Sequence, residues 1–165
     1  FKAGEEWVGD VRFATYAINP SLTPADAGVA WAGGITLTSA LVDLSPARAG
    51  DIIPLALTWT AASAQSATLS VLVHLGPPEG APVDQNDGQP ANSYRPTTTW
   101  RAGEVITDIH NLPIPADLPP GTYHVNVGLY NPDDGTRPAV VVGDAPQPDN
   151  QLRLTPTFDL PWRTP

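Results

Sequence analysis

Three histidines are the residues of this sequence whose type could support metal chemistry. His74, His110 and His124 lie in three separate segments with apolar residues at every second position, and Asp87 and Asp108 are near two of them. Imidazoles from neighbouring strands can bind one zinc or other divalent ion. In the alternation, however, His74 and His124 lie opposite the apolar residues. Both are therefore predicted to point away from the core, which favours a surface or hydrogen-bonding role.

Two other interpretations of these histidines are kept open. The weaker one is a metal site, whose candidate ligands are His74, His110 and Asp108. The other pairs His110 with Asp108 or Asp87, so that a hydrogen bond fixes the long loop that ends near residue 101. The sequence predicts no bound metal and no cofactor.

Carboxylates in and beside the same loop could support glycoside hydrolysis. That reaction needs two carboxyl groups about 5 to 10 Å apart across a cleft. The residues available are Asp84, Asp87, Glu104 and Asp108. A chain this acidic provides such residues easily, and the sequence has no G-x-S-x-G, H-E-x-x-H or phosphate-binding glycine motif. A catalytic role is therefore not predicted.

The long loop itself, residues 76–101 (GPPEGAPVDQNDGQPANSYRPTTTWR), could bind a sugar. Loops of this length are uncommon in compact domains and are often functional. Sugar-binding sandwiches stack exposed aromatic rings on pyranose faces and add polar hydrogen-bonding groups. The candidate ligand-binding residues are Tyr94, Arg95, Trp100, Arg101, Asn92 and Asp87. The favoured interpretation of Trp100 is nevertheless a packing role, as a plug under the loop at one end of the sandwich.

The elements that would position these residues are predicted to be β-strands. Apolar residues recur at every second position in three segments, 51–60 (DIIPLALTWT), 68–75 (TLSVLVHL) and 121–130 (GTYHVNVGLY). Five further segments show the pattern less clearly: VRFATYAI, ITLTSALV, EVITDIHNL, PAVVVG and QLRLTPTF. Pro54 lacks an N–H for the ladder, so its strand is predicted to be an edge strand or to contain a bulge.

About eight short strands with almost no helix favour an all-β fold, an antiparallel β-sandwich of immunoglobulin or fibronectin III type. Two turn motifs support this prediction. Tyr123 follows a Pro-Pro-Gly turn at a strand start, where sandwiches place a tyrosine corner. The NPDDG segment, residues 131–135, has the composition of a hairpin turn rather than of a calcium site, which needs more oxygen ligands.

Length and composition predict one domain. The chain has 165 residues, 41% of them hydrophobic, and five tryptophans, which is enough for one core. Residues 1–20 are expected to be a linker or an edge strand, and residues 21–165 a single β-sandwich. The start, FKAGEEWVGD, has neither an initiator Met nor a signal-peptide core, so we expect a soluble piece of a longer protein.

Charge excludes some partners. The formal net charge is −9, with 17 Asp and Glu scattered against 8 Lys and Arg. Such a surface repels phosphate backbones and anionic lipids, so nucleic-acid binding is not predicted. No apolar run approaches the roughly 20 residues that span a bilayer, so direct membrane insertion is not predicted either. The absence of cysteine excludes disulfides and thiolate chemistry but does not define the compartment.

Several of these motifs together resemble a known family. The segments VHL followed by QNDG, TTTWRAGEVITDIH and LPPGTYHVNVGLY are similar to the β-sandwich domain of bacterial, Chloroflexi-type membrane glycosyltransferase-like proteins. Those proteins are related to dolichyl-phosphate-mannose protein mannosyltransferases. The last segment also resembles the fibronectin III corner motif. The similarity covers about residues 34–138. It implies an extracytoplasmic accessory domain in the cell envelope, without catalytic residues, whose partner is the rest of a larger membrane protein.

The sequence thus predicts a non-catalytic accessory domain that serves as a scaffold or an interaction module. The first alternative is a carbohydrate-binding module whose partner is a glycan, and the second is a hydrolase domain. Exposed rings on the long loop would favour the module, and paired carboxylates across a cleft would favour the hydrolase.

Overall fold

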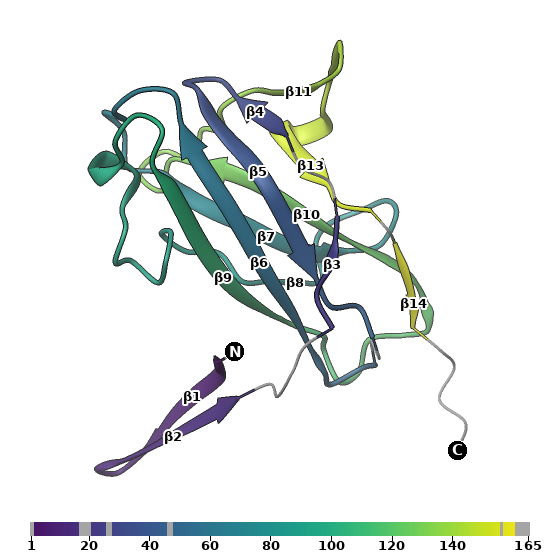
Figure 1. The fold of residues 1–165 in the computed structure, drawn as a ribbon. Coiled ribbons are helices and arrows are strands. Elements are labelled where there is room, and N and C mark those ends of the chain that lie inside the picture. The colour runs from purple at the N-terminus through teal and green to yellow at the C-terminus, as the bar shows by residue number, and fades with distance from the viewer. Residues whose placement is uncertain (1, 17–20, 26–27, 46–47, 156, 161–165) are drawn as a thin grey trace.

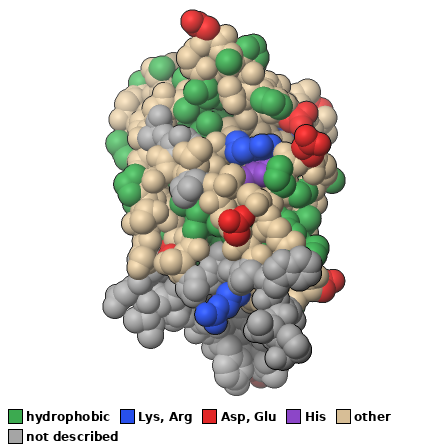
Figure 2. Space-filling model, turned by 90° about the vertical axis from the view of Figure 1, so that its right-hand side faces the viewer, with side chains coloured by type: hydrophobic (Ala, Val, Ile, Leu, Met, Phe, Trp, Pro, Cys, Tyr) green, Lys and Arg blue, Asp and Glu red, His purple; other side chains and the backbone are tan. Residues whose placement is uncertain are grey.

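The computed structural model is a β-sandwich of two antiparallel sheets, which confirms the all-β prediction (Figure 1). It describes residues 2–16, 21–25, 28–45, 48–155 and 157–160. Assignment to the immunoglobulin or fibronectin III class stays a prediction. On the face shown in Figure 2 the acidic side chains are scattered among polar and apolar ones, without one dominant acidic patch.

The first sheet has the strand order β12-β11-β4-β5-β6-β9, with β3 paired to β5. Its strands are β3 (Thr23–Pro24), β4 (Val29–Trp31), β5 (Ile35–Val42), β6 (Ile52–Ala61), β9 (Val105–Pro113), β11 (Val140–Val142) and β12 (Ala145–Pro146). The second sheet has the order β13-β10-β7-β8, with β14 also paired to β10. Its strands are β7 (Ser70–Gly76), β8 (Asp84–Gln85), β10 (Gly121–Tyr130), β13 (Gln151–Arg153) and β14 (Phe158–Leu160). Two short 3₁₀ turns, η1 (Thr97–Thr99) and η2 (Pro148–Asn150), complete these elements.

The N-terminal segment forms a hairpin of its own. Strands β1 (Lys2–Val8) and β2 (Val11–Tyr16) pair only with each other among the described residues. The expected linker or edge strand over residues 1–20 is therefore replaced by a separate two-stranded sheet, while residues 17–20 lie outside the described part. Together with this hairpin the described residues form fourteen strands, not about eight. The expected number was too low because several strands have only two or three residues.

The core consists of the alternating apolar residues of facing strands, as the sequence predicts. Every second residue from Ile53 to Trp59 in β6 and from Tyr123 to Leu129 in β10 is buried. Trp59 meets Trp31 of β4 edge to face, with ring centroids 5.5 Å apart and planes at 62°. Strand β7 is buried on both faces. Its outer face must therefore be covered by another part of the chain.

Strand β6 is a central strand, so the edge prediction from Pro54 is wrong. It pairs with β5 on one side and β9 on the other. Proline is tolerated because the pairing with β5 begins one residue later, at Leu55 opposite Val42. The Pro54 carbonyl accepts the Asp43 N–H at 3.1 Å. The irregularity of this ladder lies in β5 instead, just after Leu37.

The NPDDG segment is a turn but not a hairpin. The Asn131 side chain accepts the Asp133 N–H at 3.0 Å, and Gly135 has a positive φ of 74°. The flanking strands β10 and β11 belong to different sheets, so the turn carries the chain across the sandwich. Hydrogen bonds from Thr136 lower the pKa of Asp134, whose carboxylate is used within the turn.

The predicted tyrosine corner is confirmed. The Tyr123 hydroxyl donates to the Pro119 carbonyl at 2.9 Å, from a buried ring at the start of β10. We expect Tyr123→Phe to lower the free energy of unfolding by about 1 kcal/mol, because it leaves that carbonyl without its partner. Urea denaturation measures the change. Tyr130→Phe, at the other end of the strand, is the control and should stay within about 0.5 kcal/mol. An equal loss in both variants would contradict the corner's role.

Candidate functional site

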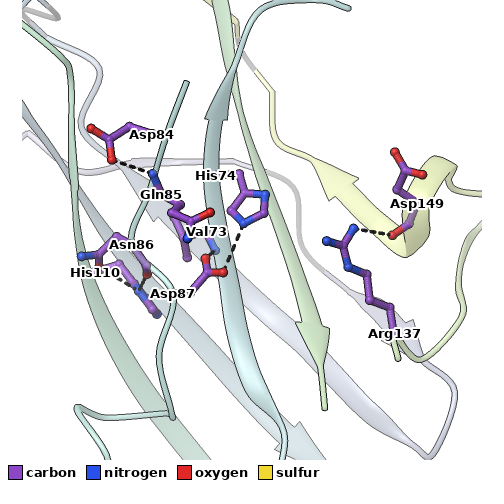
Figure 3. A network of polar contacts seen from close by, with 9 residues as sticks. All are labelled: Val73, His74, Asp84, Gln85, Asn86, Asp87, His110, Arg137 and Asp149. Carbon is purple, nitrogen blue, oxygen red and sulfur yellow. Dashed lines mark hydrogen bonds and ion pairs between the residues drawn. The ribbon is translucent and has the colours of Figure 1, made fainter. Parts of the chain in front are cut away.

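The polar centre of the molecule is a buried histidine and aspartate pair on β9. His110 Nε2 lies 2.8 Å from Asp108 Oδ2, and His110 Nδ1 lies 2.9 Å from the Asn86 carbonyl. Asp108 is only 1% exposed. Both ring nitrogens of His110 therefore have an oxygen atom within hydrogen-bond distance. These contacts join β9 to the loop at Asn86, and Figure 3 shows the contact between His110 and Asn86.

The second carboxylate oxygen of Asp108 holds a strained turn. It accepts the Ala91 N–H at 2.8 Å. Ala91, Asn92 and Ser93 have φ values of 52°, 53° and 69°. Three consecutive non-glycine residues in the left-handed region are unusual, and each costs about 1–2 kcal/mol. A buried carboxylate at the start of the turn explains how this conformation persists.

A second aspartate and histidine pair joins the loop to β7. Asp87 accepts the Val73 N–H at 2.9 Å with one oxygen and lies 3.2 Å from His74 Nε2 with the other (Figure 3). The next residue, Gly88, exchanges backbone hydrogen bonds with Val71. The loop therefore continues the second sheet beyond β8. The hypothesis that His110 pairs with Asp108 is confirmed, and Asp87 is found to pair with His74 instead.

The histidines expected on the surface are buried. His74 is 6% and His124 3% exposed. Alternation places both opposite the core face, as predicted, but the chain covers that face: Asp87 lies against His74, and the segment after β7 lies over Gly76 and the His124 ring. Burial and the nearby charge of Arg153 lower the pKa of His124 below its usual value. A period-two pattern gives the side of a strand but not what covers it.

The lowered pKa of His124 predicts a pH dependence. The unfolded chain binds the proton more readily than the folded one, so the free energy of unfolding should fall as the pH drops below about 6.5, through the folded pKa. Above about pH 6.5, the neutral His124 makes its full contribution to the free energy of unfolding. Urea denaturation measures the free energy of unfolding at about pH 7.5 and at about pH 5. Between these two pH values it should fall more for the wild type than for His124→Gln. Equal losses would mean that His124 is not the cause.

The candidate metal ligands are not gathered. His110 and Asp108 form one pair, and His74 is bonded to Asp87 in another. Within the described part of the chain, no group of three or more His, Cys, Asp or Glu side chains is placed to hold an ion. The side chains proposed for zinc serve to attach the loop.

The carboxylates considered for hydrolysis also have local partners. Glu104 forms an ion pair with Arg95 at 2.7 Å and accepts the Arg101 N–H. The hydrogen bond from Arg95 lowers the pKa of Glu104. Asp84 accepts the N–H of its neighbour Gln85 at 2.7 Å. With Asp87 and Asp108 in the two pairs above, each of the four carboxylates accepts at least one backbone N–H.

Trp100 is a packing residue and is not available for stacking on a ligand. It is 2% exposed, it belongs to the core cluster, and its indole N–H donates to the Arg95 carbonyl at 2.9 Å. This confirms the plug interpretation and corrects the ligand candidate. Tyr94, in contrast, is 86% exposed. The predicted aromatic platform is therefore reduced to one ring.

A cleft of about 300 Å³ lies where the loop meets β9. It brings together the predicted residues Asn92, Asp87, Asp108 and His110. Its other lining residues, which the sequence did not single out as a site, are Asn86, Gly88, Gln89, Ser93 and Ile109. Turn composition marked this segment as a loop, but only contacts with β9 could show that its polar side chains share a cleft. The other candidates, Tyr94, Arg95, Trp100 and Arg101, are not among the lining residues.

Comparison with known proteins adds no assignment. No model of a known protein family matches this sequence, and no curated protein matches it significantly. Within the described residues, no helix has the length and apolar character needed to cross a bilayer.

Proposed function

We propose that this chain is a non-catalytic extracytoplasmic accessory domain of a larger membrane glycosyltransferase-like protein in the cell envelope. The observation that carries the proposal is the use of the loop's polar groups. Hydrogen bonds of Asp87 and Thr97 in the loop, and of Asp108 in β9, join the loop to β7, to the turn before β7 and to β9. The resemblance over residues 34–138, including the confirmed tyrosine corner at Tyr123, supports the choice of parent protein and the fibronectin III-like class.

The same contacts argue for a scaffold rather than an enzyme. A general acid or base must be within reach of the substrate and able to exchange its proton. Asp108 is buried and holds His110 and the Ala91 N–H, while Asp87 holds His74 and the Val73 N–H. Residues in such positions stabilise a rigid loop. A rigid loop on a sandwich is suited to a fixed contact with another part of the same protein.

Cell fractionation tests this proposal. An antibody raised against the purified domain should detect, in the native bacterium, a membrane-fraction protein much larger than the 17.4 kDa of this chain. Protease added to spheroplasts should degrade the epitope, while a cytoplasmic marker protein stays intact. A band of the chain's own mass in the soluble fraction, protected from protease, would overturn both the parent and the location.

Glycan binding is the second candidate, favoured by the cleft beside Tyr94. An exposed phenol ring on the loop can stack on a pyranose face, and Asn86, Gln89 and Asn92 in the cleft supply amide donors and acceptors. Tyr94 directly follows the left-handed turn over residues 91–93 and is the chain neighbour of Ser93, which lines the cleft.

Tyr94→Ala separates this candidate from a scaffold role. On a printed array of bacterial and plant cell-wall oligosaccharides, the variant should lose most of any signal that the wild type gives, because the stacking surface is gone. Its free energy of unfolding should change by less than about 0.5 kcal/mol, since the ring is exposed. Wild-type signal that survives in Tyr94→Ala would remove the loop from the binding site.

A further inference from the structure

A larger polar pocket lies on the outer face of the second sheet, away from the loop cleft. Its volume is about 440 Å³, and it shares no lining residue with the cleft. The polar side chains that line it are His124, Asn126, Gln147, Gln151, Arg153, Glu79 and Asp149. The view in Figure 2 shows a histidine beside a basic side chain, with acidic and apolar groups around them. Volumes of about 300 to 1,000 Å³ are typical of small-molecule sites.

The pairing of β10 with β13 builds this pocket. Asn126 lies opposite Arg153, and Gly128 lies opposite Gln151. A Cβ on Gly128 would come within 3.3 Å of the Asn150 carbonyl and 3.5 Å of the Gln151 side chain. The glycine therefore allows the segment around Gln151 to approach the sheet and close one wall. The segment after β7 forms the opposite wall, where Arg153 Nη2 donates to the Pro78 carbonyl at 3.1 Å.

The charges of the pocket are not neutralised by one another. Among the described residues no ion pair links Arg153 to Glu79 or Asp149, although all three line the pocket. A guanidinium has five N–H donors. Arg153 uses one of them for its hydrogen bond to the Pro78 carbonyl. The pocket thus offers donors from Arg153 and acceptors from the two carboxylates.

His124 adds a buried imidazole to the lining of the pocket. Burial and the charge of Arg153 lower its pKa, which keeps the imidazole neutral at neutral pH. A neutral imidazole has one donor and one acceptor nitrogen. Its Nδ1 is buried and has no hydrogen-bond partner within the described residues. Unpaired buried nitrogens are uncommon in folded proteins and call for an explanation.

The lining chemistry selects the class of ligand. A phosphate or another strong anion would meet the two carboxylates, and a simple cation would meet Arg153. The amides of Asn126, Gln147 and Gln151 each donate and accept, as do hydroxyl groups. We propose that this pocket binds a neutral sugar residue, whose hydroxyls donate to the carboxylates and accept from Arg153 and the amides. The proposal is independent of the cleft at Tyr94 and of the accessory role.

NMR titration of the ¹⁵N-labelled chain tests the pocket directly. The probes are glucose, galactose, mannose, N-acetylglucosamine and their β-linked disaccharides. At least one should cause saturable shifts at the backbone amides of Asn126, Gln151 and Arg153. Gln151→Ala should weaken that binding about three- to tenfold, through the loss of neutral hydrogen bonds. If Gln151→Ala disturbs the fold, Glu79→Gln on an exposed loop serves as the second variant. It should also weaken sugar binding.

The matched control is Gln85→Ala, which removes the same kind of side chain from an exposed position on β8, outside both the pocket and the loop cleft. It should leave sugar affinity at the pocket unchanged. Shifts confined to Asn92, Ser93 and their neighbours would assign sugar binding to the cleft and overturn the pocket. The absence of saturable shifts for every sugar would overturn it as well. The fractionation result for the accessory role is unaffected by either outcome.

Discussion

Asp108→Ala is expected to lower the free energy of unfolding by about 3–5 kcal/mol, because two groups that bond to the buried carboxylate lose their partner, at about 1–3 kcal/mol each. Two groups lose their acceptor together: the His110 ring, at 2.8 Å from the carboxylate, and the Ala91 N–H. A water molecule cannot easily take the place of the lost carboxylate, because Asp108 and His110 are buried. Urea denaturation followed by circular dichroism measures the loss.

Two further variants serve as controls for this result. Asp117→Ala removes an exposed carboxylate and should change the free energy of unfolding by less than about 0.5 kcal/mol. Asp108→Asn retains an acceptor for the Ala91 N–H and should be destabilised less than Asp108→Ala. A loss of under about 1 kcal/mol in Asp108→Ala would show that the pair does not hold the loop.

Trp100→Ala should be the second large effect, with a loss of about 3–5 kcal/mol from the cavity that it creates. The indole is buried in the core and also donates to the Arg95 carbonyl, so the substitution removes packing and a loop contact together. Differential scanning calorimetry and urea denaturation should agree on the loss.

Tyr94→Ala is the matched control for Trp100→Ala, because it removes another aromatic ring from the same loop. The Tyr94 ring is exposed, so the melting temperature of Tyr94→Ala should be close to that of the wild type. Trp100→Phe keeps most of the packing but loses the hydrogen bond, so its loss should be smaller than that of Trp100→Ala. A stable Trp100→Ala would contradict the packing role.

The longer strands could be predicted because their cores alternate without interruption. In β6, β7 and β10 each second residue is apolar over seven or more positions, which specifies one buried face. Strands of two or three residues, such as β3 and β8, carry no period and depend on a neighbour for their pairing. The turn at residues 131–135 was predictable from its residue types, but its role as a crossing between sheets was not.

The candidate site was predictable only in part. His110 and Asp108 are two positions apart on one strand, so their side chains share a face and their pairing follows from sequence. The partners that matter more are distant: Asn86 reaches His110 across 24 positions, and Asp108 reaches Ala91 across 17. The burial of His74 and His124 depends on loops folding over the outer face. Strand periodicity contains no information about such coverage.

Amide hydrogen exchange at Ala91 tests most directly the central claim, that the polar residues of the long loop fix it to the sandwich. Its N–H donates to the buried Asp108 carboxylate from a turn that is otherwise open to solvent. The account predicts that this N–H exchanges as slowly as the core amides of β9, and that Asp108→Ala, which removes the acceptor, accelerates its exchange more than that of the β9 amides. Exchange at the rate of an unstructured loop, in a wild-type protein whose strands are protected, would contradict it.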